Sequence, residues 1–458
     1  MTFFGALGTA VLGVNAAATW VGNISDNIAN ATTNGYKEVN TAFSDLVNNK
    51  LLGDSPVIDS TKHGGVTASA RFENRAQGNY LQTYQTTNVA VTGAGFFPVG
   101  RPTSVVDRVV NGESDRTVQV DDTTYYTRLG DFHLDAGNYL VNSNGYYLLA
   151  SATGSTNPQL LKVDDSPIDA IATTEVNFTA NLPANAAAGA VSRYAVAVND
   201  ATATAVSGQY DFEVVWTKGT LANEWQLEIN AGETGQTNFG PMTVTFADGT
   251  TPPFQSGRLQ SITTADGAVT LSPSTAGGAA TISISPEFGG AAQPITLNLG
   301  NFNGGFNASA TSGLTQYNTP DGTPTNVDYT QDGLPGAEFK NVSIDAAGQI
   351  IYNYANGRTQ TEFQISLGNF REPDRLDRFD DTTFLATAAS GAVRYGNIDD
   401  PDNAAGIGKL IPTTVEQSTV DVAEQMTFLV QAQQAYGMNS QVITAADEML
   451  SRLIDLKR

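Results

Sequence analysis

The sequence contains no cysteine, and this absence excludes several kinds of chemistry. In a chain of 458 residues without cysteine, no disulfide, thiolate metal site or cysteine nucleophile can form. Stability must therefore come from packing or from assembly. Histidine is almost as scarce, because His63 and His133 are the only two. A histidine triad or a multi-histidine metal site is hard to build from them, and we interpret both as ordinary surface or loop residues.

Positive charge is also scarce. The chain has 23 Lys and Arg residues against 46 Asp and Glu residues, which gives a formal net charge of −23. Binding to nucleic acid requires clustered cations that neutralise phosphates, so we expect no nucleic-acid partner. The acidic balance fits a soluble protein that works outside the cytoplasm, although solubility alone explains it as well.

Motifs of known enzyme classes are missing too. The sequence has no G-x-S-x-G, H-E-x-x-H or phosphate-binding loop. Its acidic pairs lack EF-hand spacing, and we interpret them as solvated loop carboxylates. Carboxylate pairs of glycosidases come from distant strands, and nothing in the sequence indicates one. We therefore expect no enzyme, no catalytic residue, no metal site and no cofactor. The pairs are Asp121-Asp122, Asp164-Asp165, Asp380-Asp381 and Asp399-Asp400.

The amino-terminal stretch is apolar but is not typical of a secretory signal. The first basic residue is Lys37, so the positively charged region with which a signal peptide begins is missing. Alternating steps of three and four residues indicate an amphipathic helix from Phe3 to Asn30 instead, which Asn34-Gly35 would end. A signal peptide or membrane anchor is the weaker alternative. The predicted apolar seam comprises Phe4, Leu7, Val11, Val14, Ala18, Val21, Ser25 and Ile28, with Ile24 beside it.

A second long helix is predicted from Thr419 to Arg458, where the chain has no proline and a single glycine. Its seam is heptad-like and carries polar residues at Gln425 and Asn439, which would fix register at some cost in stability. A helix with such a seam needs a partner, and the amino-terminal helix offers one. The seam comprises Val422, Gln425, Leu429, Ala432, Tyr436, Asn439, Ile443, Ala446, Leu450 and Leu453.

Between the helices the pattern changes to that of short β-strands. Asn144-Gly145 and Asn356-Gly357 stand between alternating runs and predict hairpins. Trp216 and Trp225 lie in neighbouring predicted strands, where we expect them to pack a sandwich core. Apolar residues from Ala42 to Leu51 suggest a short helix before the first strands.

The predicted fold class is mainly β and multi-domain, with the amino- and carboxy-terminal helices pairing as a coiled coil. Two helices flank two β-rich blocks, which in turn flank an inserted block. This nested order suggests a linear arrangement whose two chain ends meet at one pole. We expect three parts. Residues 1–71 with 402–458 would form a terminal helical domain with its connector, residues 72–183 with 312–401 an inner β-domain, and residues 184–311 an inserted outer β-domain.

Four stretches resemble the bacterial flagellar axial proteins of the rod and hook family, and among them most closely the hook proteins. They cover both ends and both flanking β-blocks, about half of the chain. The family signature near the amino terminus falls on Asn27, Asn30, Gly35, Tyr36 and Lys37. The four stretches are DNIANATTNGYKEVNTAFSDL, NVAVTGAGFF with YYTRLGDFHLDAGNYLVNSNGY, NVSIDAAGQIIYNYANGRTQ with LATAASGA, and QAQQAYGMNSQVITAADEMLSRLIDLKR.

The resemblance implies a structural role in the flagellum. Subunits of this family are exported unfolded through the flagellar type III apparatus without a cleaved signal, and they polymerise beneath a hook cap into a helical tube. The tube is a flexible universal joint that connects the distal rod to the hook–filament junction. The terminal helices would form its core, and we expect them to be disordered in the monomer and to fold on assembly.

Two other functions remain as alternatives. A distal rod protein shares the end signatures, but rod proteins are usually shorter and lack an inserted block such as 184–311. A secreted β-rich adhesin with coiled-coil ends would bind a receptor or glycan through its outer domain. If the purified protein forms tubes, a hook or rod protein is favoured; if it binds a ligand and forms no tubes, an adhesin is favoured.

Overall fold

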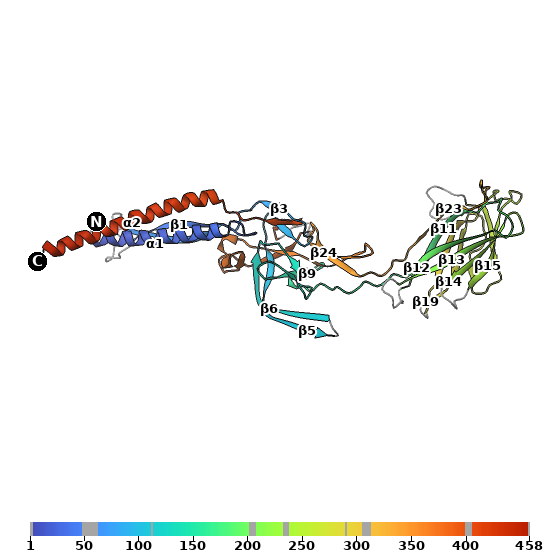
Figure 1. The fold of residues 1–458 in the computed structure, drawn as a ribbon, viewed down its shortest axis with the longest axis horizontal. Helices are drawn as coiled ribbons and strands as arrows, with labels where there is room; N and C mark the ends of the chain where they lie inside the picture. The colour runs from blue at the N-terminus through green and yellow to red at the C-terminus, as the bar shows by residue number, and fades with distance from the viewer. Residues whose placement is uncertain are drawn as a thin grey trace, which may run out of the picture. The chain divides into compact units, whose positions relative to one another are not determined.

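The computed structural model describes residues 3–47, 63–110, 113–200, 208–231, 238–288, 291–304, 313–398 and 405–456 (Figure 1). Its contacts divide the chain into two compact units. The first consists of Met1–Asp164, Asn341–Asn353 and Thr359–Arg458, and the second of Asp165–Lys340 and Tyr354–Arg358. The fold is mainly β with a helix at each end of the chain, as the sequence predicts.

The two terminal helices belong to the first unit and lie side by side (Figure 1). Helix α1 spans Phe3–Ala29 and α2 spans Val422–Leu456, close to the predicted bounds. Asp421 caps α2, because its Oδ1 accepts hydrogen bonds from the amides of Ala423 at 2.9 Å and Glu424 at 3.3 Å. A side chain thus satisfies amide groups that the first helical turn leaves free.

A two-stranded hairpin packs along α1. Strand β1 (Val39–Val47) pairs antiparallel with β2 (His63–Phe72). The short helix predicted from Ala42 is therefore wrong over its described part, and Leu51 lies outside the described residues. The physical reason is pairing with a distant strand: each residue from Val39 to Asp45 stands opposite a residue of β2 in an antiparallel ladder, which fixes the extended backbone of a strand.

The main sheet of the first unit has eleven strands. Its Asn144-Gly145 and Asn356-Gly357 turns join strands as predicted, with Gly145 at φ 81° and Gly357 at φ 83°. The strands in order are β24 (Phe339–Ile344), β25 (Gln349–Tyr354), β26 (Thr359–Gln364), β9 (Tyr147–Ala152), β5 (Phe97–Val110), β6 (Glu113–Thr127), β29 (Thr383–Leu385) and β28 (Asp377–Asp380), with β7 (His133–Leu134), β8 (Leu140–Val141) and β10 (Gln159–Leu160) at the side.

Short strand pairs connect this sheet to the helices. The pair β3–β32 lies just before α2 and brings the chain from residue 80 beside the chain from residue 414. The pairs are β3 (Tyr80–Gln82) with β32 (Thr414–Glu416), β4 (Val89–Thr92) with β31 (Lys409–Pro412), and β27 (Ser366–Asn369) with β30 (Arg394–Asn397); a 3₁₀ turn η1 covers Pro373–Arg375.

The second unit is a sandwich of two sheets around one apolar core. Trp216 and Trp225 are both buried in this core, as predicted, and Trp216 stacks on Phe178 with ring centroids 6.2 Å apart. The five-stranded sheet is β12 (Val191–Asn199), β13 (Gln209–Lys218), β14 (Glu224–Ala231), β15 (Asn238–Phe246) and β16 (Leu259–Thr264). The other sheet is β17 (Thr270–Leu271), β18 (Ala279–Ile284), β21 (Ile295–Asn301), β11 (Glu175–Asn181) and β22 (Gly313–Thr315), with β23 (Thr325–Gln331) on β11 and the pair β19 (Glu287–Phe288) and β20 (Ala291–Ala292) apart.

The expected boundaries of the inserted block, 184 and 311, fall inside this second unit, because β11, β22 and β23 belong to its sheet.

Neither terminal helix, over its described residues, combines the length and apolar character that crossing a membrane requires.

Candidate functional site

Helices α1 and α2 face each other mainly through small and polar residues, with a few large apolar ones, at three-, four- and seven-residue spacing. On α1, Ala16 is buried, and beside it one buried stripe comprises Ala10, Gly13, Ala17, Ile24 and Asn27. These alternate in steps of three, four and seven residues, which keep one stripe of a helix toward its neighbour. On α2 the buried residues also recur at seven-residue steps, with Asn439 half-buried between them: Gln425, Ala432 and Ala446.

The predicted seam of α1 lies one residue later along the chain than this stripe. Leu7, Val14, Val21 and Ile28 are half-buried, and Val11 is 43% exposed. Phe4 lies in α1, but its side chain is outside the described set. The contact to α2 therefore includes Ile24, which was predicted beside the seam, and is otherwise centred on neighbours of the predicted residues; at Ala10 and Gly13 these neighbours are smaller than Val11 and Val14.

The predicted seam of α2 is partly buried. Leu429 and Ile443 are half-buried, whereas Val422, Tyr436 and Leu450 are exposed. The side chain of Leu453 is outside the described set. A single subunit thus buries a narrow stripe of α2 and leaves other apolar residues of this helix uncovered.

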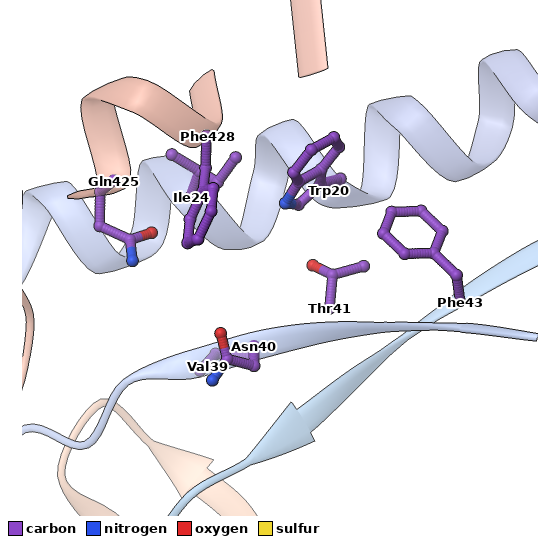
Figure 2. Close-up of a pocket in the computed structure, with 8 residues that line it drawn as sticks. All are labelled: Trp20, Ile24, Val39, Asn40, Thr41, Phe43, Gln425 and Phe428. Atoms are coloured by element: carbon purple, nitrogen blue, oxygen red, sulfur yellow. The ribbon is translucent and has the colours of Figure 1, made fainter. Parts of the chain in front are cut away.

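An aromatic cluster joins both helices to the hairpin (Figure 2). The ring of Trp20 on α1 lies 5.5 Å from the ring of Phe43 on β1 and 6.2 Å from that of Phe428 on α2, centroid to centroid. With Ile24 and Gln425, these rings line a cavity of about 220 Å³. The cluster adds apolar contact between α1, α2 and the hairpin, and the preferred geometries of aromatic pairs make this contact specific.

Asn27 uses the full hydrogen-bonding capacity of its buried amide. Its Oδ1 accepts from the amide of Val39 at 2.9 Å and from the hydroxyl of Tyr36 at 3.2 Å. Its Nδ2 donates to the carbonyl of Val39 at 3.0 Å and to Oε1 of Gln425 at 3.1 Å. One side chain thereby ties the end of α1 to the first strand and to α2.

Two other signature residues shape the end of α1. Asn30 donates from Nδ2 to the carbonyl of Asp26 at 3.1 Å, and the backbone amide of Asn30 donates to the same carbonyl at 3.1 Å. Gly35 has φ 70°, and a Cβ there would stand 2.8 Å from the amide nitrogen of Leu129. Only glycine fits both the left-handed backbone and this close approach.

Lys37 is fully buried and forms an ion pair with Glu416 just before α2, with Nζ and Oε1 2.5 Å apart. Arg128 of the β-domain approaches the other carboxylate oxygen at 3.5 Å. The guanidinium of Arg128 also donates to the carbonyls of Val91 at 3.2 Å and Gly93 at 2.7 Å. We call Lys37, Arg128 and Glu416 the charge trio; it links the signature, the β-domain and the start of α2.

Two cations share one carboxylate in the charge trio, and their pKa values reflect it. Burial lowers the pKa of Lys37 to about 8, an effect that the charge of Glu416 only partly offsets and that of Arg128 reinforces. Burial also lowers the pKa of Arg128. The trio is therefore held by surrounding structure rather than favoured by its own charges.

The chain segments around the trio are bonded to each other directly. The amide of Gly35 donates to the carbonyl of Glu416 at 2.8 Å, and the amide of Thr419 donates to the carbonyl of Tyr36 at 3.2 Å. The amide of Glu38 donates to Oγ1 of Thr419 at 2.9 Å. We call residues 35–38 with 416–419, together with the charge trio, the junction.

Sequence reasoning found the signature but missed two partners of the junction. Glu416 and Arg128 are far from Lys37 along the chain, and neither lies in a local pattern that indicates a pair. Gln425 was recognised as a polar residue of the seam. Its partner Asn27 was recognised only as part of the signature.

Comparisons with known proteins identify two flagellar family domains in the chain. A family model described as "Flagellar hook protein FlgE/F/G D1 domain" matches residues 114–192, and one described as "Flagellar basal body rod FlgEFG protein C-terminal" matches residues 412–456. The second match contains Glu416 and the described part of α2.

Similarity to individual proteins extends along the whole chain. The flagellar hook protein FlgE of Brucella melitensis is 30% identical over 465 residues, covering 100% of both chains. FlgE of Escherichia coli is 27% identical over 468 residues, covering 99% of this chain and 100% of its own. A crystal structure of Helicobacter pylori FlgE2 covers 72% of this chain and 98% of its own at 13% identity, with a TM-score of 0.33, an overlap too small to support an argument.

Proposed function

The chain belongs to the flagellar hook protein family, and from this premise we propose that it polymerises into the tube of the bacterial flagellar hook. The observation that carries the proposal is similarity over the full length, terminal helices included, to proteins named flagellar hook protein. The proposed role is structural, because the members of this family are structural proteins of the flagellum. We infer no catalytic activity for this chain.

The helices are the part that would build the polymer core. Helix α2 carries a set of large apolar side chains that stay exposed within the described part of the subunit. Uncovered apolar surface of this extent on a helix marks a contact surface, and a contact between different faces of identical subunits generates a helical filament. The exposed apolar residues are Val422, Met426, Val430, Tyr436, Met438, Val442, Met449 and Leu450.

We propose that α1 and α2 of one subunit pair as a coiled coil within this core. The seven-residue recurrence of Gln425, Ala432 and Ala446 supports the pairing. The predicted seam residues then divide between two tasks. Half-buried Leu429 and Ile443 serve the pair within the subunit, and exposed Val422, Tyr436, Leu450 and Val11 serve contacts between subunits.

The three-part division of the chain follows from this role as a proposal. Residues 1–71 with 402–458 would supply the tube core, the sheet of the first unit an inner β-layer, and the second unit the inserted outer domain. Modest polar contacts between β-layers of neighbouring subunits would let them slide while the helical core holds, which is what bending of a universal joint requires.

The remaining partners are those that the family implies. A hook cap would receive the subunits, and the distal rod and the hook–filament junction would hold the two ends of the tube. Export through the flagellar type III apparatus would place the protein outside the cell without a cleaved signal peptide. The lack of cysteine suits a chain that travels unfolded, because no disulfide has to form or break.

We further propose that the terminal helices become fully ordered only on assembly. The stripe that α1 and α2 share is built from small and polar residues, so it buries little apolar area, and helices gain most of their stability from such burial. Neighbouring subunits would supply the missing area by covering the exposed residues of α2.

Electron microscopy of the purified chain under polymerising conditions tests this function. The wild-type protein should form tubes. Met438→Asp, at a side chain 63% exposed in the subunit, should leave the subunit folded and abolish the tubes, because a charge would be buried between subunits. The control Gln441→Asp replaces an exposed polar residue of α2 and should assemble. Failure of the wild type to form tubes, with binding of a glycan instead, would favour an adhesin.

A further inference from the structure

Arg378 lies where three segments of the first unit meet. It belongs to β28, and its guanidinium carbon stands 4.7 Å from the ring centroid of Tyr36, 5.0 Å from that of Phe72 and 5.8 Å from that of Phe384. Tyr36 belongs to the junction, Phe72 ends the hairpin beside α1, and Phe384 belongs to β29 of the main sheet. We call these three rings the aromatic cage.

The cage is deeply buried on two sides. Tyr36 and Phe384 are both fully inaccessible to solvent, and Phe72 is half-buried. Rings attract a cation through the negative charge of their faces, and the attraction grows when water is excluded. Arg378 is thus held by groups from the helical part and from the sheet at once.

A hydrogen bond adds direction to this contact. Nη2 of Arg378 donates to the backbone carbonyl of Lys37 at 2.5 Å. The bond is charge-assisted, which makes it stronger than one between neutral groups. Arg378 thus reaches Asn27 of α1 through Tyr36, and it reaches Glu416, which lies just before α2, through Lys37.

Strand pairing anchors Arg378 in the main sheet. Arg378 stands opposite Phe384 in the β28–β29 pair, and β29 pairs with β6 of the main sheet. We propose that Arg378 is a positioning residue that couples the main sheet to the junction, so that displacement of one moves the other. Arg378 places a side chain of the main sheet against Phe72 at the end of the hairpin. The charge trio and the β3–β32 pair link other segments.

Arginine suits this position for a geometric reason. A planar guanidinium can lie against rings and still donate in its own plane to a carbonyl, whereas an ammonium group is a compact, strongly hydrated charge that cannot do both. Arg378→Lys should therefore behave like Arg378→Gln, which separates stacking from charge alone.

Hydrogen exchange of the full chain, read by mass spectrometry, tests the coupling in the subunit without polymerisation. In Arg378→Gln, amide protection should fall about tenfold in residues 30–40 and 66–72, a change on the scale of one lost cation–π and hydrogen-bond contact. Protection in residues 89–100 and 139–150 of the β-domain should not change. The neighbouring exposed Arg375→Gln is the matched control and should leave both regions as in the wild type.

Phe72→Leu provides a second route in case Arg378→Gln folds poorly, because it keeps an apolar side chain and removes one ring face. It should lower protection in the same two segments by a smaller factor. Unchanged protection in both variants, or an equal loss throughout the first unit, would overturn the proposal. The result does not depend on tube formation, so it stands apart from the test of the hook function.

Discussion

Gly13 of α1 lies against the side chain of Asn439 on α2: a Cβ at Gly13 would stand 2.7 Å from Oδ1 of Asn439. Asn439 holds its own amide by donating to the carbonyl of Ala435 at 2.9 Å. The polar break in the seam of α2 therefore meets a position where α1 has no side chain. We expect this fit to set the register in which the two helices pair.

Enlarging Gly13 should disturb the helix pair. Gly13→Leu should destabilise the packing of α2 on α1 by about 1–3 kcal/mol, because the new side chain needs the space that Asn439 fills. A Cβ at Gly22 of the same helix would meet no atom of the described residues within 4 Å, so Gly22→Leu should instead gain up to about 1 kcal/mol from helix propensity. Urea unfolding of the assembled protein, in which we expect the helices to be fully ordered, followed by circular dichroism distinguishes the two. Equal effects would contradict a specific contact at Gly13.

Removing the amide of Asn27 should loosen both helix ends that it joins. Asn27→Leu leaves the amide and carbonyl of Val39 and the side chain of Gln425 without this partner, and each unmet buried group costs about 1–3 kcal/mol. The control is Asn15→Leu at an exposed position of α1, which should have little effect. Amide exchange at the start of α2 measures the difference, and equal protection in the two variants would refute the role of Asn27.

Loss of Glu416 should cost more than loss of any other acid at the start of α2. Glu416→Gln leaves Lys37 and Arg128 as buried cations without a carboxylate, and breaking a buried ion pair on one side typically costs about 3–5 kcal/mol. Glu424→Gln, at an exposed position, is the control and should change stability by less than about 1 kcal/mol. Denaturant unfolding measures both. A small effect of Glu416→Gln would mean that the trio is hydrated.

The charge trio predicts a specific dependence on pH. The pKa of Lys37 is about 8 in the fold and 10.5 in its ordinary state, so between these values the unfolded chain binds more protons than the folded one. Raising the pH through this window therefore stabilises the fold, by about 3 kcal/mol at most.

Lys37→Met removes this titrating group and leaves Arg128 paired with Glu416. The difference in unfolding free energy between the wild type and Lys37→Met should shift in favour of the wild type as the pH rises from about 8 to about 10. Tyrosines whose pKa is raised by burial, such as Tyr36, titrate in both proteins, and their contribution cancels in the difference. A difference that does not change with pH would contradict the lowered pKa of Lys37.

The terminal helices and the hairpin turns were predictable because their signals are local. A run without proline and with a three-and-four step specifies a helix, and Asn-Gly between alternating runs specifies a turn. The stretch from Ala42 failed because Phe43, Leu46 and Val47 fit a helical step as well as a strand. The β2 partner, which decides between them, begins only at His63.

The face that a helix buries was less predictable than the helix. On α1, the stripe of Val11, Val14 and Val21 is more apolar than the stripe of Ala10, Gly13 and Ala17 beside it, and only the second lets α2 approach closely. Which stripe faces inward depends on the shape of the partner, which a single sequence does not contain. The same reason hides the pairing of Lys37 with Glu416.

Electron microscopy of the full chain beside chains lacking residues 1–30 or 419–458 tests most directly the claim that the terminal helices build the polymer. The account predicts tubes for the full chain and, for both truncated chains, a soluble monomer whose β-sheets unfold cooperatively. Tubes formed by either truncated chain would contradict it.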